Sequence, residues 1–182
     1  MTDRVAAPVV LVVMGVSGSG KTTVAGILAH RLGWAFMEGD ALHPRSNIEK
    51  MKAGHPLDDA DRLGWLESVA EWVEGRLDAG ESGVITCSAL KRSYRDVINR
   101  RGAGVVFVFL AGSEATIAPR LAARQAHFMP SSLLDSQFAT LEDPQPDEAH
   151  IQIDVGPPPD VIASSILRKL GLNDGLRPGK RP

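Results

Sequence analysis

The sequence lacks several features that define whole classes of protein. Cys87 is the only cysteine among 182 residues, so no disulfide can form within the chain, and a reducing compartment is indicated. The net charge is only −2, which gives no electrostatic basis for binding nucleic acid or an anionic membrane. Apolar runs such as 9–14 are far too short to span a bilayer, and residues 1–8 do not resemble a secretory signal. We therefore expect a cytoplasmic protein with neither nucleic acid nor membrane as partner.

The size and composition are those of one ordinary globular domain. Hydrophobic residues make up 43% of the chain and charged residues 23%, enough for a sizeable core and a solvated surface. Apolar stretches alternate with amphipathic ones, which predicts βα units around a mostly parallel sheet. The predicted strands are 9–14, 35–38, 83–87, 105–110 and 150–155. The predicted helices are 21–32, 44–53, 61–79, 91–100, 114–124, 131–141 and 159–170.

A phosphate-binding pattern, G-x-x-x-x-G-K-[ST], occupies positions 15–22 between the first predicted strand and the first predicted helix. That strand–loop–helix context is the one in which the pattern binds phosphate, because backbone N–H groups and the helix N-terminus face the anion. Lys21 is then placed for the β- and γ-phosphates, and the Thr22 hydroxyl is the predicted Mg²⁺ ligand. The predicted nucleotide-binding residues of the loop are Gly15, Val16, Ser17, Gly18, Ser19, Gly20, Lys21, Thr22 and Thr23. The predicted fold is therefore an α/β P-loop three-layer sandwich, with a five-stranded parallel sheet and helices on both faces.

Two stretches are longer than a βα unit requires. Residues 39–82 separate the second and third predicted strands, and residues 120–142 precede the fifth. Long insertions are usually functional, and phosphoryl transfer must be shielded from water. We predict an acceptor-binding insertion at 39–82 and a lid region at 120–142 within a single domain, 1–172, with surface decoration as the alternative. Residues 173–182 show no periodicity and are predicted to be a flexible tail.

Asp40 follows the second predicted strand. It is therefore expected at the carboxyl edge of the sheet, where ligands bind in open α/β folds. A carboxylate there can accept or orient the proton of an attacking hydroxyl. A helix-capping role is equally compatible with its position.

Further segments resemble the bacterial gluconokinases of the shikimate-kinase/adenylate-kinase-like group. They are DALHPRSNIEKM at 40–51, PLDDADRLGWL at 56–66, CSALKRSYRD at 87–96, RLAARQAHF at 120–128 and SQFATLE at 136–142. Their order and spacing are kept from about residue 9 to residue 170. The resemblance implies transfer of the ATP γ-phosphate, with Mg²⁺, to the 6-hydroxyl of D-gluconate by a homodimer.

Gluconate is a polyol carboxylate, so its site needs cations for the carboxylate and hydrogen-bonding groups for the hydroxyls. Arginine suits this task because its planar fork can pair with both carboxylate oxygens. The predicted substrate-binding residues are Asp40, His43, Arg45, Arg62, Ser88, Lys91, Arg95 and His127. Arg45 and Lys91 could equally be solvated helix charges.

Arg120 and Arg124 lie four residues apart, on one face of a predicted helix that leads to the lid. The resemblance implies that both approach ATP, with Arg120 at the adenine and Arg124 at the transferring phosphate. The predicted catalytic residues are thus Lys21, Asp40 and Arg124. A solvated arginine pair is the alternative.

Other functions of a phosphate loop fit the sequence less well. A GTPase switch would need an Asn-Lys-x-Asp motif, which the chain lacks. A motor ATPase would need an apolar strand ending in Asp, whereas the third predicted strand leads to Cys87 and Ser88. Shikimate or a nucleoside monophosphate as acceptor, and nucleotide binding without turnover, remain open at this point.

Overall fold

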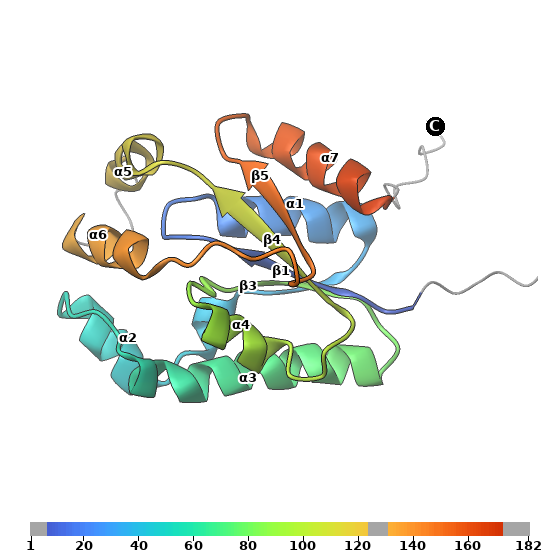
Figure 1. Cartoon of the computed structure of the whole chain (residues 1–182), viewed down its shortest axis with the longest axis horizontal. Coiled ribbons are helices and arrows are strands. Elements are labelled where there is room, and N and C mark those ends of the chain that lie inside the picture. The colour runs from blue at the N-terminus through green and yellow to red at the C-terminus, as the bar shows by residue number, and fades with distance from the viewer. Residues whose placement is uncertain (1–6, 124–130, 173–182) are drawn as a thin grey trace, which may run out of the picture.

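The computed structural model describes residues 7–123 and 131–172 (Figure 1). Five strands form one parallel sheet in the order β2-β3-β1-β4-β5. They are β1 Val10–Met14, β2 Ala35–Met37, β3 Gly83–Thr86, β4 Val105–Ala111 and β5 His150–Asp154. The predicted five-stranded parallel α/β sheet is confirmed, with β1 at its centre.

Helices cover both faces of the sheet and gather at one of its ends. In Figure 1, α1 and α7 lie on one face, and α3 and α4 lie on the other. Helices α2, α5 and α6 gather at the end where β1 turns into α1, which is the carboxyl end of the strands. The bounds are α1 Lys21–Leu32, η1 Gly39–Leu42 (a 3₁₀ turn), α2 Arg45–Lys52, α3 Asp59–Asp78, α4 Arg92–Ile98, α5 Glu114–Ala122, α6 Ser131–Thr140 and α7 Pro159–Leu170.

The predicted helices are present, with shifted ends. Helix α3 begins at Asp59, two residues earlier than predicted, because Asp58 and Asp61 form a capping box. The Asp61 N–H donates to Asp58 Oδ1 (2.8 Å), and the Asp58 N–H donates to Asp61 Oδ2 (2.9 Å). The predicted 39–82 insertion consists of η1, α2 and α3, so its second half is the helix that crosses between β2 and β3.

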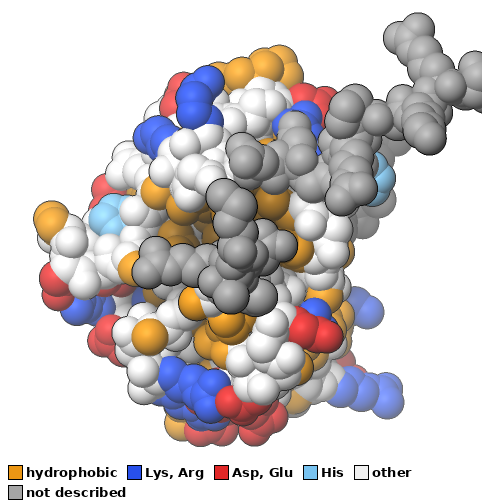
Figure 2. Space-filling view, turned by 90° about the vertical axis from the view of Figure 1, so that its right-hand side faces the viewer, with side chains coloured by type: hydrophobic (Ala, Val, Ile, Leu, Met, Phe, Trp, Pro, Cys, Tyr) orange, Lys and Arg blue, Asp and Glu red, His pale blue; other side chains and the backbone are white. Residues whose placement is uncertain are grey.

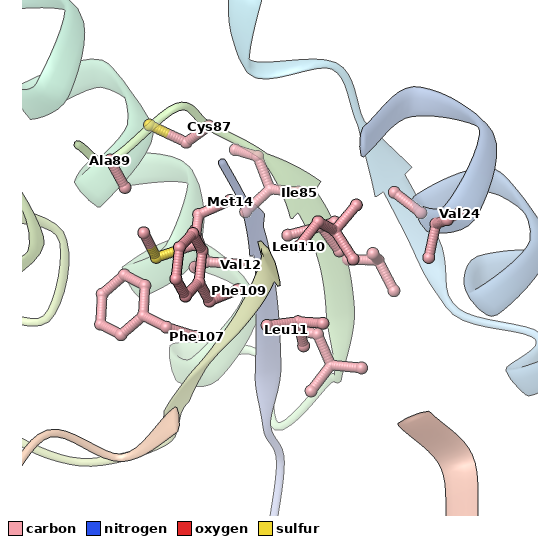
Figure 3. Close-up of a cluster of buried hydrophobic side chains, with 14 of the residues drawn as sticks. Leu11, Val12, Met14, Val24, Ile85, Cys87, Ala89, Phe107, Phe109 and Leu110 are labelled. Atoms are coloured by element: carbon pink, nitrogen blue, oxygen red, sulfur yellow. The ribbon is translucent and has the colours of Figure 1, made fainter. Parts of the chain in front are cut away.

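The core is built on the alternating side chains of β1 and β4. Leu11 and Leu110 project toward Val24 on α1, whereas Met14 and Phe109 lie on the opposite side of the sheet (Figure 3). Every residue of β1 is buried, as expected of a central strand that is covered on both faces. This burial fixes the strand whose carboxyl end carries the phosphate loop.

The surface at the other end of the sheet is drawn in Figure 2. Positive and negative side chains are interspersed on this face, and neither sign forms a continuous patch. Within the described ranges, no helix is long and apolar enough to cross a membrane.

Gly39 joins β2 to η1 at a point of very close backbone contact. A Cβ on this residue would lie 1.8 Å from the carbonyl oxygen of Thr86, the last residue of β3. The Gly39 N–H also donates to Thr86 Oγ1 (3.0 Å), and the Gly39 carbonyl accepts from Trp65 Nε1 (2.8 Å). Only glycine fits here, and this contact sets the positions of the residues on either side of it.

We predict that Gly39→Ala lowers the free energy of unfolding by about 2–3 kcal/mol, because the added methyl group must push two strand ends apart. Gly26→Ala is the matched control, since a Cβ there meets no atom within 4 Å and Gly26 lies inside α1. It should raise the free energy of unfolding by about 0.5–1 kcal/mol. Urea unfolding of both variants measures this, and a Gly39→Ala protein as stable as the wild type would contradict the steric argument.

Candidate active site

The phosphate loop connects β1 to α1 and presents polar groups without internal partners. Its last glycine, Gly20, caps α1 with a left-handed backbone (φ 95°), which favours glycine. Ser19 is 2% exposed, and its hydroxyl oxygen has no hydrogen-bond partner within the described residues. A buried hydroxyl without a partner is unfavourable, and a phosphate oxygen can accept a hydrogen bond from it. The loop therefore fits the phosphates of a nucleotide.

The charged side chain of Lys21 lies over the same loop. Its ammonium donates to the carbonyl oxygens of Gly15 (3.1 Å) and Val16 (3.0 Å). The cation thus lies against the backbone of the loop, where it can neutralise phosphate charge.

Thr22 and Glu38 place two oxygen ligands side by side next to the loop. Thr22 Oγ1 donates to Glu38 Oε2 (2.7 Å), and Thr86 Oγ1 donates to the other oxygen of the same carboxylate. No cluster of three or more His, Cys, Asp or Glu side chains suited to a metal occurs in the described part of the chain. Mg²⁺ in kinases is held by one or two protein oxygens together with phosphates and water. Thr22 and Glu38 fit that requirement.

The sequence analysis missed Glu38. The available signal was its position at the end of the second strand, two residues before Asp40. Only the fold shows that its carboxylate reaches the predicted metal ligand Thr22.

The charges of Asp40, Lys21 and Arg62 are felt at the residue that follows β3. All three charges act on Cys87, a buried thiol that follows this strand. Burial raises the pKa of Cys87 to about 12; Asp40 adds to this rise, while Lys21 and Arg62 oppose it. Cys87 is therefore a neutral thiol and not a nucleophile. A carboxylate and two cations from three different elements are thus near enough to this thiol to influence its pKa.

A pocket opens between the start of α3, the segment that leads into α4, and α6. It is lined by Leu57, Asp58, Asp59, Ala60, Arg62, Leu90, Lys91, Tyr94, Ser136, Gln137 and Thr140. We call it the acceptor pocket.

The two cations of the acceptor pocket differ in how fully they are paired. The Lys91 ammonium contacts both oxygens of Asp59 (2.8 and 3.0 Å), a carboxylate that also accepts from the Tyr94 hydroxyl. The Arg62 guanidinium lies 5.7 Å from the Tyr94 ring centre, and its Nε donates to the Leu57 carbonyl (3.2 Å). Across residues 7–123 and 131–172, no carboxylate forms an ion pair with Arg62. Arg62 is therefore the cation best placed to receive an anionic substrate.

His43 does not supply the positive charge that the sequence analysis expected. Its ring stacks on Trp65, with centroids 4.0 Å apart, and its Nδ1 is 3.3 Å from Asn47 Nδ2. Burial lowers the pKa of His43 from 6.5 to about 4, which outweighs the opposing effect of Asp40; Arg62 lowers it further. The imidazole is therefore neutral at neutral pH. Its Nε2 lies 3.9 Å from Asp40 Oδ1, which is too far for a hydrogen bond.

Two predicted substrate-binding arginines lie away from the acceptor pocket. Arg45 is on α2 with a side chain that is 91% exposed and paired with Glu49, which is the solvated helix charge considered as its alternative. Arg95 is 1% exposed; its Nε and Nη2 contact Glu148 (2.5 and 3.1 Å), and its Nη1 donates to backbone carbonyl oxygens. A guanidinium that is buried and paired in this way is closed to a substrate carboxylate. Arg95 instead acts as a structural anchor.

The remaining predicted residues divide between the phosphate loop and undescribed parts of the chain. The Ser88 carbonyl accepts from the Gly15 N–H (3.3 Å), which ties the end of β3 to the phosphate loop. Arg120 donates to the Val155 carbonyl (2.7 Å). It forms the wall of a second pocket with Gly18, Ser19, Gly20, Thr23, Val24, Gly156, Pro157, Pro158, Pro159 and Ile162. This pocket adjoins the phosphate loop and suits the base of a nucleotide. Arg124 and His127 lie outside the described residues.

We predict that the His43 ring titrates with a midpoint near pH 4, which NMR of the ring protons would show. Since burial lowers the folded-state pKa, the unfolded chain binds the proton more readily, and stability must fall as the pH drops from about 6.5 toward 4. His43→Gln should flatten this part of the stability curve. A midpoint above 6 would mean that the imidazole is not buried as described.

Comparison with known proteins agrees with this geometry. A family model described as an AAA domain matches residues 10–144. The gluconokinase of Gluconobacter oxydans is 51% identical over 92% of this chain and 94% of its own length. The thermoresistant gluconokinase of Escherichia coli is 43% identical over 86% of this chain and 91% of its own length.

Solved structures extend the comparison to the fold. The crystal structure of a gluconokinase from Sinorhizobium meliloti superimposes with a TM-score of 0.82 at 48% identity, covering 90% of this chain and 92% of that one. A shikimate kinase from Aquifex aeolicus shares the fold alone, with a TM-score of 0.60 at 15% identity, over 89% of this chain and 96% of that one. The chain belongs to the gluconokinase family of P-loop kinases.

Proposed function

We propose that this protein transfers the γ-phosphate of ATP to the 6-hydroxyl of D-gluconate, forming 6-phospho-D-gluconate. The observation that carries the proposal is a pocket whose Arg62 forms no ion pair with a described carboxylate and whose Gln137 contacts the phosphate loop at Ser17. The names of the relatives support the same substrate.

The nucleotide side uses the phosphate loop and the pocket behind it. The loop amides, the Ser19 hydroxyl and Lys21 bind the phosphates, and the Arg120 pocket takes the base. Thr22 and Glu38 would hold Mg²⁺, which would supply positive charge to the phosphates. Arg124 stays a prediction for the transferring phosphate.

On the acceptor side, two residues of opposite charge act on the two ends of gluconate. Arg62 binds the gluconate carboxylate, and Asp40 orients the attacking hydroxyl and accepts its proton. The Asp40 side chain is 70% exposed, so it is open to an incoming substrate. The neighbouring His43 ring is neutral and forms no ion pair with it. His127 stays a prediction at this site, as do the homodimer and the cytoplasmic location.

Shikimate is the less supported acceptor. It also carries a carboxylate, so Arg62 alone does not exclude it. The likeness to shikimate kinase reaches only 15% identity, whereas the gluconokinase relatives reach 51%.

We expect gluconate to be phosphorylated at least about tenfold more efficiently than glucose, measured as kcat/KM, because glucose leaves the Arg62 charge unpaired. Arg62→Ala should lower the efficiency on gluconate by a similar factor and leave that on glucose nearly unchanged. Arg101→Ala, which removes an arginine paired with Asp78 outside both pockets, is the control. Equal efficiency on both sugars would refute gluconate as the substrate, and preference for shikimate would favour the other acceptor.

We expect Asp40→Asn to lower kcat by about 100-fold or more, the usual effect of losing a general base. Affinity for ATP, measured by calorimetry, should stay within about twofold, because the carboxylate acts on the acceptor. Asp78→Asn, at the exposed end of α3, is the matched control. Equal losses in kcat and in ATP affinity would return Asp40 to a structural role.

A further inference from the structure

Gln137 connects the acceptor pocket to the phosphate loop. Its Oε1 accepts from the backbone N–H of Ser17 (2.7 Å), and its Nε2 donates to Ser17 Oγ (3.1 Å). Both polar atoms of the carboxamide are thus used on a single residue of the loop. The same side chain lines the acceptor pocket together with Arg62 and Lys91.

The helix that carries Gln137 is held firmly in place. Leu133 and Leu134, in the first half of α6, are buried, and Phe138 packs against the core. Immediately after the helix, the Glu142 N–H donates to the Leu90 carbonyl (2.8 Å). A side chain on such a helix has little freedom to move away from its partner.

Arg95 completes this anchoring. Its Nη1 donates to the carbonyl oxygens of Ala89 (3.0 Å) and Glu142 (2.9 Å), while Glu148 neutralises the guanidinium. The arginine therefore ties Glu142, two residues after α6, to the segment that carries Leu90 and Lys91, two residues of the acceptor-pocket wall. This bonding connects the end of α6 to the pocket wall, and Gln137 connects α6 to the loop.

We propose that Gln137 is a positioning residue for phosphoryl transfer. It fixes the distance between the acceptor pocket and the phosphate loop by binding Ser17 with both ends of its carboxamide. Transfer needs the acceptor oxygen in line with the γ-phosphate, and an error of about 1 Å can cost about 100-fold in rate. Gln137 carries no charge, so its removal should disturb the alignment of the acceptor and not the charge around the phosphates. This inference rests on the proposed function.

The test is a set of steady-state measurements with gluconate and ATP varied separately. Gln137→Ala should lower kcat/KM for gluconate about tenfold or more, the loss of about 1.4 kcal/mol that two net hydrogen bonds supply. The KM for ATP should change less than about threefold, because Lys21 and the loop amides other than that of Ser17 keep their surroundings. Gln137→Met keeps the length and packing of the side chain without its amide, and it should show the same loss.

The controls separate alignment from general damage. Gln145→Ala removes a glutamine side chain from an exposed turn, where it bonds only to the nearby Asp143 carbonyl, and should match the wild type. Ser17→Ala removes the hydroxyl partner but keeps the N–H; its effect should be smaller in the Gln137→Ala background than in the wild type.

The outcomes distinguish the two proposals. Wild-type efficiency in Gln137→Met, a rise in the KM for ATP as large as the loss in kcat/KM for gluconate, or fully additive effects of Ser17→Ala and Gln137→Ala would each overturn the role of Gln137. In all three cases the wild-type protein would still phosphorylate gluconate. Absence of gluconate phosphorylation by the wild type would instead refute the proposed function, and this inference with it.

Discussion

The contact between Gly39 and the end of β3 underlies the geometry of the active site. Because Gly39 has no side chain, the link after β2 lies directly on the Thr86 carbonyl and also accepts a hydrogen bond from Trp65. The residues on its two sides then differ in their contacts: Glu38 accepts from Thr22 beside the phosphate loop, and Asp40 lies near the buried His43 ring. One backbone contact thus positions both carboxylates to which the proposed mechanism assigns a role.

The arrangement of charge follows a division between paired and unpaired cations. Arg95 and Lys91 are held by Glu148 and Asp59, so their positive charge is compensated before any substrate binds. Removing one partner from the buried pair would leave an uncompensated charge, which is strongly destabilising. Arg62 has no such carboxylate partner within the described residues. The paired cations build the pocket, and the unpaired one is available to the ligand.

His43 shows how burial can change the function of a residue type. A solvated histidine beside Asp40 would become more easily protonated, but stacking on Trp65 removes the ring from water. The ring is neutral at neutral pH, so it contributes packing and not positive charge beside Asp40.

The sequence by itself determined the five parallel strands, the phosphate loop with Lys21 and Thr22, and the family. These depend on local patterns: apolar periodicity, glycine spacing and motif order, which hold whatever the rest of the chain does. The tertiary structure alone decided which cations remain unpaired. Arg62 and Arg95 carry equal weight as sequence motifs, yet only the fold brings Glu148, 53 residues away along the chain, onto Arg95. It also decided that His43 is neutral, that Glu38 reaches Thr22 and that Gln137 binds Ser17, because each of these depends on contacts between distant segments and on the burial they create.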